Sequence, residues 1–354
     1  MSAFDRQHRA PGRLGQARTN RSRGAALISA MITVTLVATL ASAALWQQWR
    51  HVEIESAERS RAQTAWLLTG ALDFSRLVLR EDKGPADHLG EPWALGLQES
   101  KLSAFLSQDK QAREGDPEVF LSGAITDAQS RLNVRNLIEN GQASVTGRAS
   151  FAKLFTLLGL PLAELSTLQQ QLLRAQQAAS PISNTNASAP SGTANAPLMP
   201  QETPQLVCLG LSPRTAAQLT PFVSVLPEAT PLNLNTAGPE VIYASLPGLD
   251  MAAAQQFVRQ RANLAPLETL EAASKALGPQ LNEKLHGIST KYFFIRGRMR
   301  LEDTVQEDEL LVERNGTKIT ILWRYRAVRN QPSLLPNSPP HNTQSAGLLQ
   351  SAKP

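Results

Sequence analysis

The sequence predicts an α+β fold in which a long N-terminal helix packs on a small antiparallel sheet, with a large inserted all-α domain. The first observation is that neither Gly nor Pro occurs between Ala25 and Thr69, so a helix of roughly 65 Å can run without interruption. The second is that segments of strand composition lie on both sides of a helical block, at 118–125, 291–295 and 318–325.

The first part of this helix is apolar enough to cross a membrane. No charged residue occurs from Ala25 through Trp49, and at about 1.5 Å per residue this stretch covers a hydrocarbon core of roughly 30 Å. Three arginines lie just before it, within residues 18–23, whereas the flank behind it carries both signs of charge. The more positive flank stays in the cytoplasm. We therefore expect a single-pass protein of the cell inner membrane with a periplasmic C-terminal domain.

The net charge of +5 resides in the first 24 residues, which hold six Arg and one Asp. The rest of the chain has 29 basic and 29 acidic side chains. A surface that attracts nucleic acid needs an excess of basic side chains on the working protein. We therefore expect no nucleic-acid partner. The single cysteine, Cys208, cannot form an internal disulfide, and its apolar neighbours favour a buried structural residue.

The residues at the start of the apolar stretch indicate a processing site. An ordinary secretory signal is cut after its apolar run, whereas here a glycine stands directly before it. The segment Arg23-Gly24-Ala25-Ala26-Leu27-Ile28 resembles the prepilin processing motif, in which a membrane peptidase cuts after glycine and methylates the new N-terminus. Glycine suits this step because a backbone without Cβ can enter a tight protease site. By this resemblance Ala25 becomes the first mature residue; the alternative is an uncleaved signal anchor.

The fifth residue of the mature chain would be Ser29. Most pilins and pseudopilins have Glu at this position, where it is thought to neutralise the N-terminal ammonium of a neighbouring subunit. An uncompensated carboxylate in lipid is costly, so its omission fits a subunit that has no neighbour above it. This substitution points to the tip of a filament.

Beyond the predicted membrane span, the helix carries an apolar stripe. Ala65, Leu68, Leu72 and Leu79 recur at steps of three, four and seven residues, so they share one helix face. We expect this stripe to pack on the protein's own sheet and also to face partner helices. A long helix that lies half in lipid and half on a globular head is the pilin architecture.

Composition divides the rest of the chain. The segment 118–125 predicts a strand, and Asp127–Leu137 predicts a turn and a second strand. Few large apolar residues occur in 176–205, which predicts a disordered loop. The expected regions are a leader (1–24), a transmembrane helix (25–49), a pilin-like helix with the first strands (50–138), the inserted all-α domain (139–288), the remaining strands (289–330) and a disordered tail (331–354).

Three motifs in this order resemble the general secretion pathway protein K family. They are the leader without Glu at mature position five, Asp127–Leu137, and Pro231-Leu232-Asn233-Leu234-Asn235-Thr236-Ala237. The resemblance touches most of residues 20–330. It implies a minor pseudopilin of the type II protein secretion system, processed by prepilin peptidase and joined to the minor pseudopilins I and J at the pseudopilus tip. Such a complex supports export of folded proteins across the outer membrane.

Two alternatives use the same residues differently. The segment Leu232–Leu270 also resembles a DNA-binding helix-hairpin-helix, but Asp250 replaces the second glycine of the hairpin and would repel a phosphate. Asn233, Asn235 and Thr236 are better interpreted as an Asx-type turn or a helix cap. The other alternative is a minor pilin of a type IV pilus-like system.

Catalysis and cofactor binding are not expected. The chain has no Gly-x-Ser-x-Gly motif and no phosphate-binding glycine-rich loop, so we predict no enzyme activity. The acidic run Glu307-Asp308-Glu309 is interpreted as a solvated loop. Members of the protein K family can bind calcium beside an acidic stretch containing Asp-Trp-x-Asp. This sequence has no such stretch, so no metal ligand and no cofactor is assigned.

Overall fold

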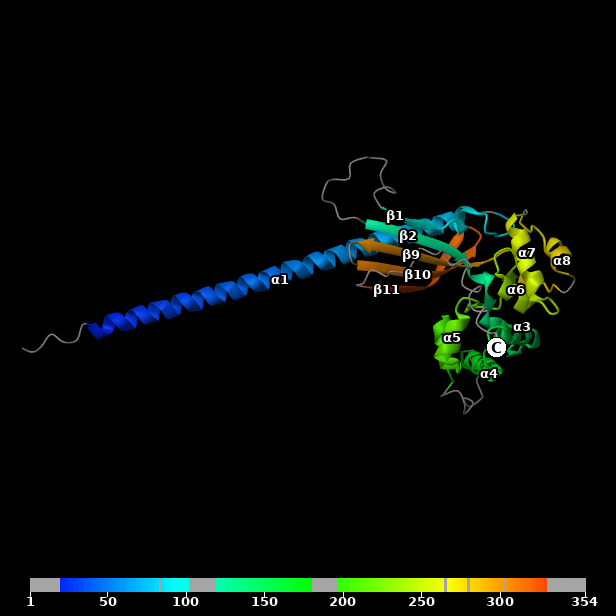
Figure 1. Cartoon of the computed structure of the whole chain (residues 1–354), viewed down its shortest axis with the longest axis horizontal. Helices are drawn as coiled ribbons and strands as arrows, with labels where there is room; N and C mark the ends of the chain where they lie inside the picture. The colour runs from blue at the N-terminus through cyan, green and yellow to red at the C-terminus, as the bar shows by residue number, and fades with distance from the viewer. Residues whose placement is uncertain are drawn as a thin grey trace, which may run out of the picture. The chain divides into compact units, whose positions relative to one another are not determined.

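The computed structural model describes residues 20–82, 84–101, 119–179, 196–263, 266–278, 281–301 and 304–329. The chain divides into two compact units, Met1–Gln63 and Thr64–Pro354. Helix α1 (Asn20–Glu81) begins in the first unit and ends in the second (Figure 1). The predicted tail 331–354, most of the leader and the centre of the predicted loop 176–205 lie outside the described residues.

The first unit is described through α1, which is long and apolar enough to cross a membrane from Ala25 onward. Five hydroxyl groups interrupt this apolar surface, and each donates to a backbone carbonyl three or four residues earlier, at 2.8–2.9 Å. They belong to Ser29, Thr33, Thr35, Thr39 and Ser42. Because lipid offers no acceptor, such internal hydrogen bonds are what a membrane helix requires.

The second unit contains a five-stranded antiparallel sheet in the order β1-β2-β9-β10-β11. Its strands are β1 (Leu97–Lys101), β2 (Val119–Asp127), β9 (Tyr292–Leu301), β10 (Thr304–Asn315) and β11 (Lys318–Arg329). Residues 128–291 separate β2 from β9, yet these two strands pair side by side in register from Val119 with Leu301 to Asp127 with Phe293. The strand pairing therefore confirms the predicted α+β fold, with a large insertion between the second and third strands of the sheet.

The end of α1 covers one face of this sheet. Leu68, Leu72 and Leu79 are buried there against Phe293, Ile295 and other apolar residues of the strands. Gly297 lies directly beneath the helix, where a Cβ would come within 2.8 Å of Leu68 Cδ1. The missing side chain allows the helix to approach the middle strand closely.

The opposite face of the sheet carries paired charges. Arg296 and Arg298 of β9 lie beside Glu309 and Glu307 of β10, at 3.0 and 3.5 Å. The prediction of a solvated loop at 307–309 is therefore wrong, because alternating charges on adjacent strands neutralise each other across the ladder. Asp308 points the other way and is fully buried between the guanidinium groups of two β11 arginines, Arg324 and Arg326.

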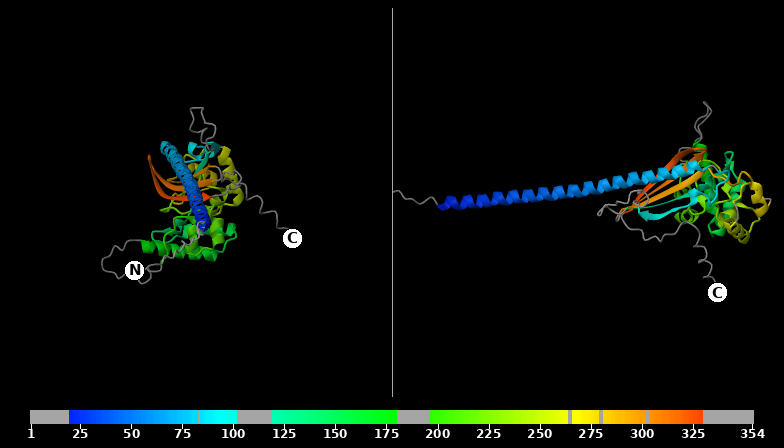
Figure 2. Two further views of the ribbon diagram at one scale, coloured as in Figure 1. Left: turned by 90° about the vertical axis from the view of Figure 1, so that its left-hand side faces the viewer. Right: turned by 90° about the horizontal axis from the view of Figure 1, so that it is seen from above.

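The insertion is a helical domain beyond one end of the sheet (Figure 2). Its helices are α3 (Val145–Leu157), α4 (Leu162–Ala179), α5 (Pro213–Leu219), α6 (Pro239–Ser245), α7 (Met251–Asn263) and α8 (Leu270–Leu277). They enclose a second apolar core, centred on residues such as Phe151, Phe155 and Leu168. Short ladders join the domain internally: β3 (Leu132–Asn133) with β6 (Val223–Ser224), β4 (Ile138–Glu139) with β5 (Gln142–Ala143), and β7 (Leu232–Asn233) with β8 (His286–Gly287).

The segment Asp127–Leu137 differs from its prediction as a turn and a second strand. It forms two 3₁₀ turns, η2 (Ala128–Ser130) and η3 (Val134–Leu137), around the two-residue strand β3. Asp127 and Asn133 accept the backbone N–H two residues ahead, at 2.6 and 3.0 Å, and so cap these turns. Short polar side chains compete with the sheet for backbone hydrogen bonds. Two further 3₁₀ turns are η1 (Pro92–Ala94) and η5 (Thr203–Leu209). Cys208 lies in η5 and is exposed, so its prediction as a buried residue is wrong: the turn buries Leu206 and Leu209 instead.

Replacing Gly297 by Val should lower the free energy of unfolding of the head by about 1–3 kcal/mol, because the new side chain would overlap Leu68 and Leu72 in the packed core. Gly70 is the control, since it lies on α1 in open space, with no atom within 4 Å of the place that a Cβ would take. Gly70→Ala should raise stability by about 0.5–1 kcal/mol. Thermal or urea unfolding of both variants measures the difference, and equal stability of G297V and wild type would contradict this packing.

Candidate functional site

The structure places the predicted stripe on the side of α1 that faces the sheet. Leu68, Leu72 and Leu79 are buried by the protein's own strands, and Ala65 is half-buried. The packing on the sheet agrees with the expectation. Contact of the same stripe with partner helices stays a prediction, and its buried leucines offer little surface for it.

A second apolar stripe lies on the opposite side of the same helix. Trp66, Gly70, Phe74 and Leu77 follow one another at steps of four, four and three residues, which places them on one face. Trp66 is 77% exposed, Phe74 52% and Leu77 40%. The predicted site residues do not include this stripe, although its spacing is as regular as that of the buried stripe. We call these four residues the outer stripe of α1.

An apolar groove of about 250 Å³ adjoins the outer stripe. It lies between α1 and the segment that leads into β1, and its lining includes Phe74, Val78, Trp93 and Leu95. Leu95 is itself strongly exposed, whereas Trp93 is buried edge-on against Phe293 with ring centroids 5.2 Å apart. Large apolar side chains next to a groove form the kind of surface on which another protein packs.

The two processing residues, Gly24 and Ala25, both lie in the first turns of α1. They are far from the outer stripe in sequence, and they belong to the first unit of the chain. Cleavage between them stays a prediction.

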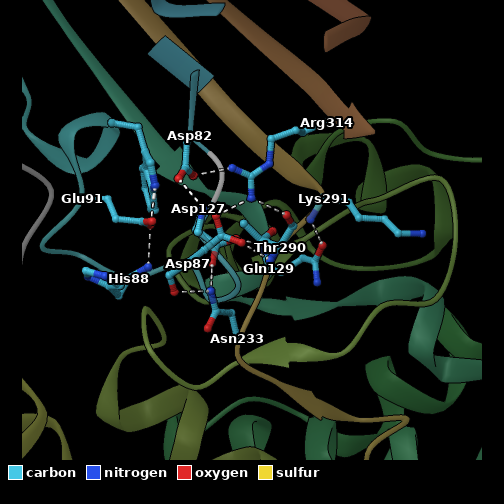
Figure 3. A network of polar contacts seen from close by, with 12 residues as sticks. Asp82, Asp87, His88, Glu91, Asp127, Gln129, Asn233, Thr290, Lys291 and Arg314 are labelled. Carbon is cyan, nitrogen blue, oxygen red and sulfur yellow. Dashed lines mark hydrogen bonds and ion pairs between the residues drawn. The ribbon is translucent and has the colours of Figure 1, made fainter. Parts of the chain in front are cut away.

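A network of buried polar side chains joins the sheet to the helical domain (Figure 3). Its centre is Asp127, the last residue of β2, which is 2% exposed. One carboxylate oxygen accepts hydrogen bonds from Asn233 Nδ2 at 2.8 Å and from the Thr236 hydroxyl at 2.5 Å. Asn233 Nδ2 also donates to the backbone carbonyl of Asp87, at 3.1 Å. Residues from three distant segments are thereby held together.

Arg314, close to the end of β10, ties the end of α1 into this network. Its guanidinium group donates to Asp82 at 2.5 Å, to Asp87, and to the Thr290 carbonyl at 3.2 Å. Asp87 in turn accepts the backbone N–H of Thr290, at 2.7 Å. Burial raises the pKa of the Asp87 carboxyl even though the Thr290 hydrogen bond and the Arg314 charge act to lower it. A buried carboxylate of this kind is tolerated because it is hydrogen-bonded and paired.

Three acidic side chains meet beside Arg314. Asp82, Asp87 and Glu91 place carboxylate oxygens within 4.8 Å of one another, which is a spacing that could hold a cation. Arg314 already pairs with two of them, and Glu91 accepts hydrogen bonds from the Trp93 indole at 2.7 Å and from His88 N–H at 2.9 Å. Protein donors thus satisfy this cluster, which gives no reason to assign a metal site to it.

The asparagine motif has a wider role than the predicted turn. Asn233 Oδ1 accepts the N–H of Asn235 at 3.0 Å, which is the expected Asx turn. Asn235, however, exchanges two hydrogen bonds with the backbone of Leu267, and Thr236 reaches Asp127. The motifs at 127–137 and 231–237 are therefore two halves of one contact. The joint occurrence of the two motifs in the sequence indicated that they belong together, but their separation along the chain could not show that they are in contact.

Side chains of the hairpin itself and of α3 occupy the helix-hairpin-helix segment. Asp250 accepts the N–H of Ala253 at 2.7 Å and so occupies the start of α7, where a phosphate would bind in a DNA-binding hairpin. From the other side, Lys153 Nζ donates to the carbonyls of Tyr243 and Leu246 at 2.6 and 2.8 Å. These contacts favour a packing role for the hairpin.

The pKa of Asp127 gives a test of the network. Burial raises this pKa to about 6, although hydrogen bonds from Thr236 and its neighbours oppose the rise. The folded protein therefore binds this proton more tightly than the unfolded chain, so the contribution of Asp127 to stability is largest near pH 4 and declines toward pH 6. Asp127→Asn removes this titration. The stability deficit of D127N relative to wild type should shrink by up to about 3 kcal/mol from pH 4 to pH 7.

Urea unfolding at several pH values measures this deficit. Asp308 is the control with the opposite sign: burial acts to raise its pKa, but Arg326 and Arg324 lower it overall. The deficit of Asp308→Asn should therefore grow as pH rises from strongly acidic values toward neutral. If the stability deficit of D127N also grew with pH, this would contradict the raised pKa of Asp127.

Comparison with known proteins supports the family resemblance. Two family models described as type II secretion system protein K match residues 130–228 and 232–290. Type II secretion system protein K of Pseudomonas aeruginosa is 26% identical over 303 residues, which cover 80% of this chain and 86% of that protein. Both models fall on the helical domain with its two joined motifs.

A solved structure shares the fold. The crystal structure of the GspK-GspI-GspJ complex from the type 2 secretion system of enterotoxigenic Escherichia coli contains a chain that matches with a TM-score of 0.51 and 17% identity. The match covers 77% of this chain and 98% of that one. With its long N-terminal helix, its antiparallel sheet and its inserted helical domain, this chain shares the fold of that structure. Its helical domain matches the protein K family of the type II secretion system, and these matches together support a minor pseudopilin of that system.

Proposed function

We propose that this minor pseudopilin caps the tip of the pseudopilus together with the minor pseudopilins I and J, and that it binds them through the outer stripe of α1. The observation that carries the proposal is that the second half of α1 is apolar on two opposite faces. The sheet covers one face. An exposed apolar face beside a groove is typical of a protein interaction site, so the second face calls for a protein partner.

The composition of the outer stripe fits a protein interface. Tryptophan is enriched among the residues that dominate binding energy, and Trp66 presents most of its ring to solvent. Gly70 follows one turn later and has no atom near the position that its Cβ would occupy. Another helix could therefore approach α1 closely between Trp66 and Phe74. Such packing requires no cofactor and no catalysis.

Two features support a place at the tip. After the predicted cleavage, Ser29 is the fifth residue, where most pilins and pseudopilins have Glu, and its hydroxyl donates to the Ala26 carbonyl at 2.9 Å. It therefore supplies no carboxylate for the N-terminus of a subunit above. The helical domain adds bulk beyond one end of the sheet, where it would hinder the stacking of a further subunit (Figure 2). Capping in this way would help the pseudopilus to export folded proteins across the outer membrane.

Replacing Trp66 or Leu77 by Glu should weaken binding to the minor pseudopilins I and J by about tenfold or more, because a charge would enter an apolar contact. The measurement is co-purification of the three proteins from detergent-solubilised membranes. Val145→Glu is the matched control, since Val145 is 82% exposed on α3 of the helical domain. Recovery of the complex from W66E and L77E at the level of V145E would contradict the assignment of the outer stripe.

The membrane anchor and its processing form a second part of the proposal. We expect prepilin peptidase to cut between Gly24 and Ala25 and to leave α1 in the inner membrane with the head in the periplasm. Mass analysis of the purified membrane protein should find a methylated N-terminus at Ala25. Gly24→Val should abolish the cut because a branched side chain would not enter the protease site, whereas Gly15→Val should not. An N-terminus at Met1 in wild type, or one after the apolar run, would contradict this.

A further inference from the structure

The helical domain contains a polar cleft of about 1040 Å³ that the assembly function does not use. Its walls come from η3, from the β4–β5 hairpin and from the ends of α4, together with the chain around Pro227 and Leu285. The volume is slightly above the range of about 300–1,000 Å³ that is common for ligand pockets. Ten of its sixteen lining residues are polar or charged, in contrast to the apolar groove beside α1.

Arg135 lies in the wall of this cleft without an acidic partner among the residues that the structure describes. It is half-buried, and the contact of its Nη1 atom is with Met199 Sδ, at 3.7 Å. Burial lowers the pKa of the Arg135 guanidinium, and no neighbouring carboxylate offsets this. A guanidinium group that has lost water without gaining an anion is unfavourable, unless a ligand supplies that anion.

The acidic residues of the cleft are already engaged. Glu228 accepts hydrogen bonds from Lys291 Nζ at 3.3 Å and from the Tyr292 hydroxyl at 3.1 Å. Glu139 pairs with Lys284 at 3.3 Å. Like the pair of Glu228 and Lys291, this ion pair is exposed to solvent, so it contributes little and can exchange, whereas Glu228 keeps the hydrogen bond from Tyr292. Lys284 is therefore a second cation available at the rim. The chain segment 180–195, which follows α4, contains no Asp or Glu and cannot supply a carboxylate.

We propose that this cleft binds an acidic extended segment of another protein, with one carboxylate on Arg135 and a neighbouring one on Lys284. The planar guanidinium group can donate two parallel hydrogen bonds to a carboxylate, which fixes the orientation of the bound side chain. The size of the cleft suits several residues of a peptide rather than a single small anion. This binding site is separate from the outer stripe of α1 and does not depend on the tip assignment.

The test uses the full chain in detergent and a blocked peptide of four glutamates at neutral pH, with a peptide of four glutamines as the uncharged probe. We expect calorimetry to detect binding of the glutamate peptide and no binding of the glutamine peptide. Arg135→Met should weaken this binding by about tenfold or more, because the peptide loses its charged hydrogen bonds. Arg174→Met is the control, since Arg174 is an exposed arginine of α4 outside the cleft.

The thermal stability of R135M distinguishes a ligand-binding role of Arg135 from a structural role. Methionine keeps the apolar stem and removes the uncompensated charge, so R135M should unfold at the same temperature as wild type or higher. Equal peptide affinity of wild type and R135M, or no heat of binding at millimolar peptide, would overturn the proposal. So would tight binding of succinate with no binding of the peptide, because the site would then recognise a small anion.

Discussion

Apolar side chains occupy two opposite faces of the second half of α1, and within the described residues the protein's own sheet covers one of them. Leu68, Leu72 and Leu79 pack against the strands, and Gly297 lets the helix come close to the middle of the sheet. That contact fixes which side of the helix points outward. The exposure of Trp66 and Leu77 is therefore a consequence of how the head folds. An exposed apolar surface of this kind is typical of a protein interaction site.

The polar network gives the head a defined connection between its sheet and its helical domain. Apolar packing tolerates sliding, whereas the contacts of Asp127 with Asn233 and Thr236 require one relative position of their segments. Arg314 extends the same constraint to the chain that leaves α1. The outer stripe of α1 and the helical domain are thereby joined through one hydrogen-bonded network.

The sequence predicted the elements whose side chains repeat with a regular period. The absence of Gly and Pro after Ala25 predicted the helix, and the spacing of Leu68 and Leu72 predicted its buried face. The prediction of a turn and a strand for Asp127–Leu137 was wrong because side chains there cap 3₁₀ turns. Strand β1 was not predicted because its residues lack a strand pattern. Arg314 lies 227 residues from Asp87, so no local pattern could reveal their contact. The regions of the predicted domain scheme stay predictions, as does the leader.

We propose that α1 binds partner helices with the side that faces away from its own sheet. Photo-crosslinking in cells can detect this contact, with a benzophenone amino acid placed at position 66, 68 or 145. We predict crosslinks to the minor pseudopilins I or J from position 66, and none from the buried position 68 or from the exposed position 145 on the helical domain. Crosslinks to these partners from position 145 alone would contradict the claim.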